Sequence, residues 1–346
     1  MGTVPGGVYS DSSALTGLEK GYLSSVLDEL QITDNTLFVQ SVTPPPGTPI
    51  VMTNQRYISV TGSDGATVVG NVADNVVGGS QGADSIDGGA GSDTLLGGSG
   101  ADSVIGGAGN DVGFGGVGDD QVDGGSGDDV LFGNQGDDVI YGDALSGTTP
   151  SGAGRAAANT VAGNDVIYGG QGGDRVFGLD GDDTLHGNLG DDVVYGNLGS
   201  DLLYGNQGRD LLHGGQGGDT LLGGQDADTL VGGDGSDALH GGVGADVLYG
   251  GAGNDRHDGG DGADVYVIQS NGGVDVVQWS TGDVLMIARN VNGLNIAAPD
   301  DLITQNLIST HDGNTLINLG NGNSVTLVGL NESELKAKIS NYITIT

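Results

Sequence analysis

The chain has 346 residues, of which 73 are Gly and 46 are acidic against 9 basic, so its formal net charge at pH 7 is -37. So acidic a chain cannot neutralise a phosphate backbone with Lys and Arg, which excludes nucleic acid as a partner, and it lacks the basic stripe that attracts anionic membranes. It contains 0 Cys, so neither a disulfide scaffold nor a thiolate metal site can form, and no apolar run approaches the roughly 18 residues that span a bilayer.

Residues 1–60 predict a small segment of mixed α and β structure for attachment or assembly. Residues 1–13 show no basic region followed by an apolar run, so a cleavable secretory signal is not expected. Apolar residues at helical spacing predict one amphipathic helix over residues 12–30. The residues of this stripe are Leu15, Leu18, Tyr22, Val26 and Leu30. Strands are expected at 36–42, 50–53 and 57–60, with the stiff Pro44–Pro46 run between them.

A nine-residue repeat organises residues 61–267, which we predict to form one roll domain. From Gly79 to Val267 the phase never slips over 189 residues, and an 18-residue insert over 144–161 preserves it, which leaves 19 nonapeptides. Residues 61–78 keep the spacing with degraded content and predict an N-terminal cap. The insert contains no Asp and is expected to loop out, although a poor coil of the same length would preserve the phase equally well.

Each position of the repeat has its own chemistry. Position one is Gly in all 19 rows, and positions two and four are mostly Gly, Asn or Asp, which tolerate positive φ and predict a tight turn. Position eight is Val, Leu or Ile except at Gly113, His257 and Tyr266, and its outward neighbours predict a three-residue strand. Two rows make a flattened coil, and stacked coils form two parallel sheets filled by position eight. The sequence therefore predicts an all-β solenoid.

Position six is Asp in all 19 rows. Stacking brings the carboxylates of rows n and n+2 within a few ångströms, where like charges repel strongly without a counter-ion. Carboxylates and peptide oxygens from a Gly turn form all-oxygen cages that suit Ca²⁺ better than Mg²⁺ or Zn²⁺, and about 15 to 17 bridging ions are expected. The predicted Ca²⁺ ligands are Asp84, Asp93, Asp102, Asp111, Asp120, Asp129, Asp138, Asp165, Asp174, Asp183, Asp192, Asp201, Asp210, Asp219, Asp228, Asp237, Asp246, Asp255 and Asp264.

These rows resemble the G-G-x-G-x-D-x-U-x motif of the repeats-in-toxin (RTX) family of hemolysin-type calcium-binding proteins, a motif that the rows from Gly79 to Val267 repeat in one register. The resemblance implies a right-handed parallel β-roll with Ca²⁺ held between turns. It also implies export by a type I secretion system that recognises an uncleaved C-terminal signal. The protein would then be extracellular, secreted or associated with a bacterial cell surface.

Residues 268–346 predict a β-rich C-terminal cap that carries the secretion-signal region. Alternating apolar residues predict five strands, joined by Gly-Asn turns such as Gly320–Asn323. These strands are expected at 265–270, 274–279, 283–287, 314–319 and 323–330. A short helix is expected over 332–340.

The sequence offers no catalytic set. There is no H-E-x-x-H motif, and four of the five His lie in the repeats several rows apart. Residues 78–82 (GGSQG) match a nucleophile elbow in form only, without a preceding hydrolase strand or a following helix. The GAGRAA run at 152–157 lies in the insert and is an equally weak match to a dinucleotide-binding motif. A non-enzymatic protein is therefore expected.

Position nine is aromatic or His in many central rows. The simpler interpretation is that these rings stack within the outer face and stabilise their own sheet. The alternative is a contact surface for another roll or for cell-surface glycan. The residues are Phe114, Phe132, Tyr141, Tyr168, Phe177, His186, Tyr195, Tyr204, His213, His240 and Tyr249.

We expect a structural protein that folds on extracellular Ca²⁺ and serves as an S-layer, filament or adhesion component. Two alternatives remain open at this point. One is a Ca²⁺-dependent binding module for glycan or a host partner, with its specificity in residues 1–60. The other is an accessory part of an RTX enzyme or toxin.

Overall fold

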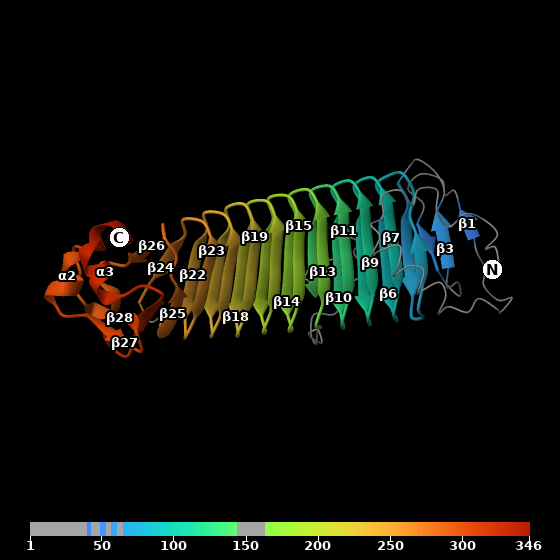
Figure 1. Ribbon diagram of the computed structural model, residues 1–346. Helices are drawn as coiled ribbons and strands as arrows, with labels where there is room; N and C mark the ends of the chain where they lie inside the picture. The colour runs from blue at the N-terminus through green and yellow to red at the C-terminus, as the bar shows by residue number, and fades with distance from the viewer. Residues whose placement is uncertain (1–39, 43–48, 53–56, 61–64, 144–162, 271) are drawn as a thin grey trace. The chain divides into compact units, whose positions relative to one another are not determined.

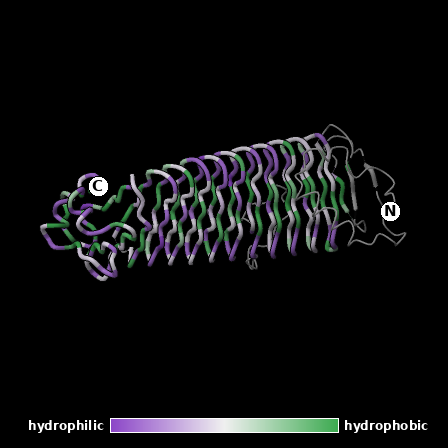
Figure 2. Tube along the Cα trace, viewed as in Figure 1, coloured by the Kyte–Doolittle hydropathy of each residue, from purple (hydrophilic) through white to green (hydrophobic). Residues whose placement is uncertain are grey.

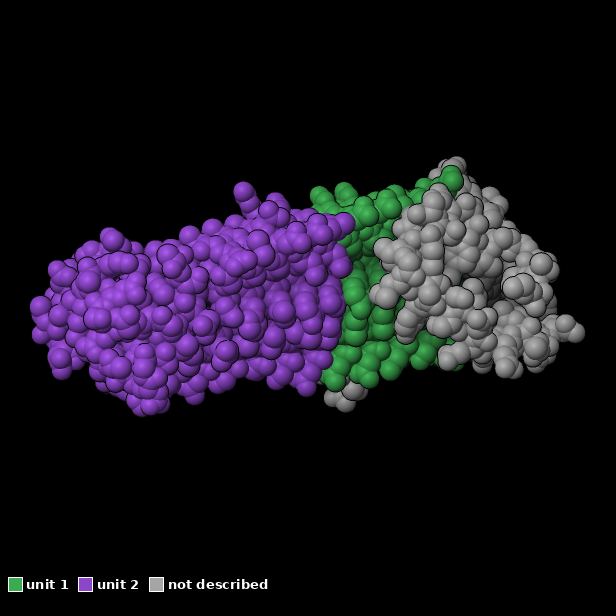
Figure 3. Space-filling view, viewed as in Figure 1, with its two compact units in different colours: residues 1–180 green, residues 181–346 purple. Residues whose placement is uncertain are grey.

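The computed structural model describes residues 40–42, 49–52, 57–60, 65–143, 163–270 and 272–346. The chain divides into two compact units, residues 1–180 and 181–346, which are coloured separately in Figure 3. The predicted helix over 12–30 lies outside the described residues, and the predicted domain boundaries at 60 and 267 stay predictions.

Unit 1 is a parallel β-solenoid in which successive strands alternate between two sheets (Figure 1). The first sheet contains β1 (Gln40–Val42), β3 (Tyr57–Val60), β5 (Val76–Gly78), β7 (Thr94–Ser99), β9 (Val112–Val117), β11 (Val130–Gln135) and β13 (Val166–Gln171). The second contains β2 (Ile50–Val51), β4 (Thr67–Asn71), β6 (Ser85–Ala90), β8 (Ser103–Ala108), β10 (Gln121–Ser126), β12 (Val139–Asp143) and β14 (Arg175–Asp180). The predicted N-terminal strands and cap therefore form coils of the same stack.

Unit 2 shows the same alternation of strands between two sheets and ends in a more varied cap. One sheet contains β15 (Thr184–Leu189), β17 (Leu202–Gln207), β19 (Thr220–Gln225), β21 (Ala238–Val243), β23 (Arg256–Asp261), β25 (Val274–Gln278), β29 (Ser324–Val328), β28 (Asn314–Asn318) and β27 (Ile308–His311). The other contains β16 (Val193–Leu198), β18 (Leu211–Gln216), β20 (Thr229–Asp234), β22 (Val247–Ala252), β24 (Val265–Ile268), β26 (Val284–Ile287) and β30 (Ile343–Ile345).

The register confirms an 18-residue coil. Gln121 pairs with Ser103 and with Val139, and the pairs beyond them follow the same spacing. Most repeat strands have six residues instead of the predicted three, because the pairing continues from positions seven to nine into positions one to three of the next row. The position-eight side chains fill the interior with exposed fractions of 0–1%. Figure 2 shows hydrophobic and hydrophilic residues alternating along each coil.

The strands before and after the insert are direct neighbours in their sheet. β11 pairs directly with β13, so Val130 lies opposite Val166, 36 residues later. Eighteen of those residues are one ordinary coil, and the remaining eighteen are the insert over 144–161. The register therefore leaves no strand between β11 and β13, and the insert itself, which is predicted to loop out, lies outside the described residues.

The C-terminal cap contains the predicted strands and several short helices. The five predicted strands correspond to β24, β25, β26, β28 and β29, while β27 and β30 were not predicted. The short helices are η1 (Val291–Gly293), α2 (Asp300–Thr304), α3 (Glu332–Ala337) and α4 (Ile339–Tyr342), of which α3 and α4 replace the single helix predicted over 332–340. No helix among the described residues is long and apolar enough to cross a membrane.

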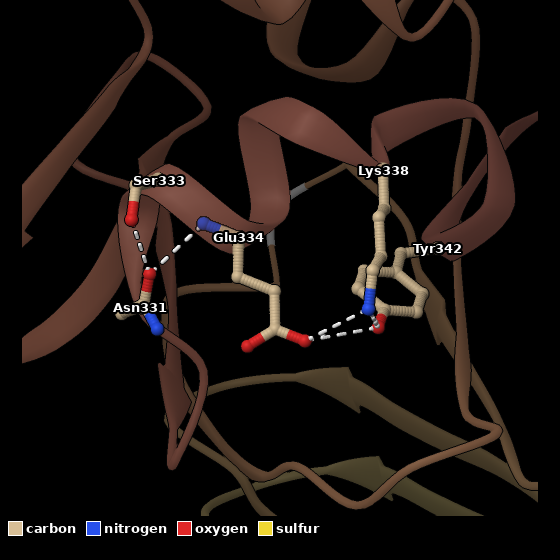
Figure 4. Close-up of polar contacts among 5 residues, drawn as sticks. All are labelled: Asn331, Ser333, Glu334, Lys338 and Tyr342. Atoms are coloured by element: carbon tan, nitrogen blue, oxygen red, sulfur yellow. Dashed lines mark hydrogen bonds and ion pairs between the residues drawn. The ribbon is translucent and has the colours of Figure 1, made fainter.

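Local capping explains where α3 begins. Asn331 Oδ1 accepts the backbone N–H of Glu334 at 2.9 Å and the hydroxyl of Ser333 at 2.6 Å (Figure 4). At the other end, Lys338 Nζ and the Tyr342 hydroxyl each lie 3.2 Å from Glu334 Oε1. These contacts satisfy the first turn of α3 and join it to α4.

The turns adopt the left-handed conformations that the repeat predicts, even where the residue type resists them. Asn188 and Asn197 at position two have φ of 83° and 80°, but Leu179 occupies the same position with φ 88°. A left-handed Leu costs roughly 1–2 kcal/mol because its Cβ crowds the following carbonyl.

Leu179→Gly should therefore stabilise the protein, whereas Leu189→Gly should not. Leu189 lies one position later in its row, is 43% exposed in β15 and has no positive φ. We expect Leu179→Gly to raise the free energy of unfolding by about 1 kcal/mol and Leu189→Gly to lower it by about 0.5–1 kcal/mol. Urea denaturation in saturating Ca²⁺ measures both, and a loss of stability in both variants would refute the strain at Leu179.

One core position holds a polar residue. His257 occupies position eight in β23 with 0% exposure, and both ring nitrogens lack a hydrogen-bond partner among the described residues. Burial lowers its pKa to about 4. Its ring meets that of Tyr266 edge-on at 6.1 Å between centroids. The imidazole therefore stays neutral in the core at neutral pH.

His257→Leu should stabilise the protein, and increasingly so in acid. At pH 7.5 the gain should be about 1–3 kcal/mol, because two unpaired nitrogens leave the core. Below the unfolded-state pKa of 6.5, His257 takes up a proton in the unfolded chain but not in the folded one, which favours unfolding of the wild type. The difference in free energy of unfolding between the variant and the wild type should therefore widen as the pH falls towards 4. Denaturation in saturating Ca²⁺ at pH 7.5 and 5.0 tests this, with His213→Leu on the outer face as control. A difference that does not change with pH would contradict the prediction.

Candidate calcium sites

The position-six carboxylates of unit 1 bridge successive coils. The Oδ1 atom of each accepts the backbone N–H of the residue at the same position one coil earlier, over 2.6–2.8 Å. On one edge the bonds run from Asn75 through Asp93, Asp111 and Asp129 to Asp165. On the other they run from Ala66 through Asp84, Asp102, Asp120 and Asp138 to Asp174.

Unit 2 repeats this ladder with bonds of 2.8–3.2 Å. One edge runs through Asp183, Asp201, Asp219, Asp237, Asp255 and Asp275. The other runs through Asp192, Asp210, Asp228, Asp246, Asp264 and Asp283. Every predicted Asp thus lies in a ladder, and all of them are 0–3% exposed.

The second carboxylate oxygen is the unusual atom of the site. Along both ladders, Oδ2 is buried, and in many rows it has no hydrogen-bond partner among the described residues. These rows include Asp93, Asp102, Asp120, Asp129, Asp138, Asp201, Asp210, Asp219, Asp228, Asp237, Asp246, Asp255 and Asp264. Asp84 differs because its Oδ2 accepts the N–H and the hydroxyl of Ser80. Burying a charged oxygen without a partner costs free energy, so this arrangement is stable only if a cation lies beside Oδ2.

The position-one Gly leaves the space that such a cation needs. A Cβ added to Gly97 would come within 2.6 Å of Asp102 Oδ2 and 2.5 Å of the Gly115 carbonyl oxygen. A Cβ on Gly115 would likewise meet Asp120 Oδ2 at 2.6 Å and the Gly133 carbonyl oxygen at 2.9 Å. A carboxylate oxygen and a peptide oxygen from the next coil therefore face the same space, and only Gly keeps it open.

The electrostatics of this arrangement disfavour the ionised carboxylates. Burial raises the pKa of Asp129 to about 9 and that of Asp120 to about 8. Neighbouring ladder carboxylates raise both pKa values further, while the hydrogen bond from the backbone one coil earlier lowers them. In unit 2 the same causes raise the pKa of Asp228 and Asp237 to about 7. Without a cation, part of each ladder would hold protons at neutral pH.

The neighbouring position-five carboxylates are different. Asp128 Oδ1 accepts the N–H of Asn164 at 3.0 Å, and Asp191 Oδ1 accepts that of Arg209 at 2.8 Å, both at exposed sites. These bonds run from the later coil to the earlier one, opposite to the position-six bonds. Position five therefore stabilises the turn from outside, and it provides a matched control for position six.

The residues present fit Ca²⁺. Among the described residues, no group of three or more His, Asp or Glu gathers as a metal cluster, so a site must draw on carboxylate and peptide oxygens together. Such mixed oxygen cages, flexible in geometry, are typical of Ca²⁺. The ladder Asp would supply Oδ2, and the position-one Gly of the next coil would supply a carbonyl oxygen. Their role as ligands stays a prediction.

Sequence reasoning missed two members of the ladder. Asp275 and Asp283 are 3% and 1% exposed and accept the N–H of Asp255 and Asp264 at 3.1 and 3.2 Å. Asp275 follows Asp255 by 20 residues and Asp283 follows Asp264 by 19, instead of the regular 18. The signal that could have found them is the local Asp-x-aliphatic pattern, which Asp275 shares with the repeats through Val277.

The position-nine rings are half-buried or buried, and many of them stack within their sheets. Phe114 and Phe132 stack at 4.8 Å between centroids, Phe132 and Tyr168 at 5.1 Å, and His186 and Tyr204 at 4.5 Å. Phe114 and Phe132 are only 1% and 3% exposed. The predicted stacking is confirmed for such pairs, whereas His240 and Tyr249 have non-aromatic residues opposite them in the neighbouring strands. The contact surface for a glycan or a second roll stays a prediction.

Asp129→Asn should remove Ca²⁺, whereas the adjacent Asp128→Asn should not. Each amide keeps the Oδ1 that accepts a backbone N–H, so the variants differ in which carboxylate charge is lost. We expect the Asp129→Asn protein to bind one or two fewer ions, counted by native mass spectrometry in saturating Ca²⁺. An unchanged ion count in that variant would show that position six is not a ligand.

Acid should partly replace Ca²⁺. The pKa of many ladder Asp lies above the unfolded value of 3.8, so their protonated forms stabilise the fold at low pH, and this stability is lost as pH rises through about 6 to 9. In chelator, lowering the pH from 7.5 to 5.0 should increase β-structure in circular dichroism. In Ca²⁺, the same change should raise the Ca²⁺ concentration needed for folding. A metal-free chain equally unfolded at both pH values would contradict this.

Comparison with known proteins agrees with this geometry. The family described as RTX calcium-binding nonapeptide repeat (4 copies) matches residues 61–95, 78–113, 114–148, 159–194, 195–230 and 231–266. No curated protein matches the chain.

Among the solved structures that match is the extracellular lipase LipA from Serratia marcescens, with 15% identity and a TM-score of 0.27. The match covers 87% of this chain and 42% of the lipase, so the chain spans less than half the length of that protein. This similarity is too low to transfer an activity. The family match, which covers more than half of the chain, shows that the chain belongs to the RTX calcium-binding nonapeptide repeat family and forms a Ca²⁺-binding β-roll.

Proposed function

We propose that this β-roll is a secreted, non-enzymatic structural protein of a bacterial cell surface or extracellular matrix, as an S-layer, filament or adhesion component. The observation that carries the proposal is the ladder of buried Oδ2 atoms in both units. Such a ladder makes folding depend on a cation along the whole roll and not at one local site. Dependence of this kind suits a protein that must stay unfolded until it reaches its place of action.

The Ca²⁺ concentration outside the cell would act as the folding signal. In a Ca²⁺-poor cytosol, folding would bury carboxylates that have no counter-ion. Burial, and after it the repulsion between neighbouring ladder carboxylates, raises the pKa of Asp129 and Asp228. When bound, Ca²⁺ supplies the positive charge that cancels this repulsion. The chain's own residues then bridge the coils, with Oδ1 on a backbone N–H and Oδ2 in the ion site. Export in an unfolded form by a type I system belongs to this proposal.

A structural role is supported by how the surfaces are built. The half-buried rings of position nine stack on their own neighbours, as Tyr141 does on Phe177 at 5.1 Å, and so stabilise the sheet that carries them. Ser80, the nucleophile of the weak elbow match, hydrogen-bonds to Asp84 within a turn. The repeated coils present the same turn chemistry every 18 residues, which suits a surface that repeats.

Two measurements test the proposal. Circular dichroism in chelator and in millimolar Ca²⁺ should show an unfolded chain and a β-rich one, and identical spectra would reject Ca²⁺-driven folding. Electron microscopy after Ca²⁺ addition should show ordered sheets or filaments. Persistent monomers would reject assembly in favour of a Ca²⁺-dependent binding module for glycan or a host partner. Hydrolase activity of the purified protein would instead favour an accessory part of an enzyme.

A further inference from the structure

The two ladders of unit 2 end differently beyond the last repeat. On one edge the last carboxylate is Asp275, and on the other it is Asp283. Both accept a backbone N–H from the coil before through Oδ1, as ladder residues do. Their Oδ2 atoms have different surroundings, and this difference decides whether a cation is needed.

Asp283 is satisfied by the protein. Its Oδ2 accepts the Ser280 N–H at 2.7 Å and lies 3.3 Å from the Tyr266 hydroxyl. That hydroxyl is held in place because it accepts the Gly259 N–H at 3.0 Å and lies 3.0 Å from the Gln278 carbonyl oxygen. Both oxygens of Asp283 therefore already face hydrogen-bond donors, and a cation at Oδ2 would compete with the positive end of an N–H dipole.

Asp275 lies among oxygens instead. A Cβ added to Gly272 would meet Asp275 Oδ2 at 3.2 Å, the Gln269 carbonyl oxygen at 3.5 Å and the Gly251 carbonyl oxygen at 3.6 Å. One carboxylate and two peptide oxygens thus surround the same point. Oxygens that face one another repel, and they are the ligand types that Ca²⁺ prefers.

The preceding carboxylates, Asp255 on this edge and Asp264 on the other, both have a buried Oδ2 without a partner among the described residues, so the two edges differ at Asp275 and Asp283. Asp255 is 2% exposed, and its Oδ2 is buried without a hydrogen bond among the described residues. Asp275 is linked to it directly, because Asp275 Oδ1 accepts the Asp255 N–H at 3.1 Å. The last step of this ladder therefore combines an unsatisfied buried carboxylate with a second one that points into an oxygen-lined space.

We propose that Asp275 is a further Ca²⁺ ligand, in a site that also draws on Asp255 and on the peptide oxygens of Gln269 and Gly251, while the edge at Asp283 is closed by Tyr266 and Ser280 without an ion. Asp275 and Gln269 lie beyond the matched repeats, which end at residue 266, while Asp255 and Gly251 lie in the last matched stretch. The inference rests on the proposed Ca²⁺-dependent folding, and it adds that the calcium ladder extends one coil further on one edge than on the other.

Ion counting separates the two ends. Native mass spectrometry of the full chain in saturating Ca²⁺ should show one ion fewer for Asp275→Asn, and the wild-type number for Asp283→Asn and Tyr266→Phe. Asp261→Asn, an exposed carboxylate in β23, is the matched control and should also keep the wild-type number. Asn at 275 keeps the oxygen that accepts the Asp255 N–H, so the coil should persist. An unchanged count for Asp275→Asn, or a lost ion for Asp283→Asn, would overturn the inference.

Two further measurements guard against misfolding. Trp279 is the single Trp of the chain, is 9% exposed and lies 6.2 Å from Tyr266 and 5.5 Å from Tyr342 between ring centroids. Its emission reports whether the cap of each variant is intact. In addition, crystals of the wild type grown with Tb³⁺ should show an anomalous peak beside Asp275 and none beside Asp283, and the reverse would reject the proposal without any substitution.

A wild-type chain that takes up no Ca²⁺ would overturn both this inference and the proposed function. A wild-type chain that takes up Ca²⁺ and keeps its ion count in Asp275→Asn overturns the inference alone. The two failures are therefore distinguishable in one experiment.

Discussion

The rest of the structure depends on one interaction, the bridge that a position-six carboxylate makes between two coils. Oδ1 accepts the backbone N–H of the coil before, for example at 2.7 Å from Asp93 to Asp111, and this fixes the carboxylate in the interior edge of the roll. The same bond leaves Oδ2 buried, and in rows such as Asp93 and Asp228 without a donor. In these rows, hydrogen bonds from the protein satisfy only Oδ1 of the carboxylate. A cation is therefore needed to neutralise Oδ2 in the folded protein.

This constraint accounts for the composition of the repeat. Residues 61–267 hold 34 Asp and 4 Arg, so -30 of the net charge of -37 lies in the roll. Much of that charge is buried in ladders and is not a solvated coat. The high Gly content has the same origin, because a side chain at Gly97 or Gly115 would occupy the space between Asp Oδ2 and a peptide oxygen.

The ladder also shows how the roll tolerates irregularity. The bond from Asp129 to Asp165 spans 36 residues instead of 18, so the carboxylate bridges the coils across the insert as it does elsewhere. At the base of the insert, Asp143 accepts the N–H of Gly163 and of Asp180 at 3.3 and 3.1 Å. At the C-terminal end, Tyr266 and Ser280 donate to Asp283 where no further coil follows. At these three places, hydrogen bonds to a carboxylate hold the irregular step.

The sequence by itself determined the coil length, the parallel pairing, the position-eight core and the Asp ladder. The reason is that a strict nine-residue period puts each position of the repeat at an equivalent place in every coil. Only the tertiary structure decided what happens where the period fails. The pairing of Val130 with Val166 shows that the coils on either side of the insert are direct neighbours, and Asp275 and Asp283 join the ladders from irregular spacings. There the partners are set by three-dimensional packing, since residues such as Tyr266 and Gln278 meet across a turn whose geometry no repeat specifies.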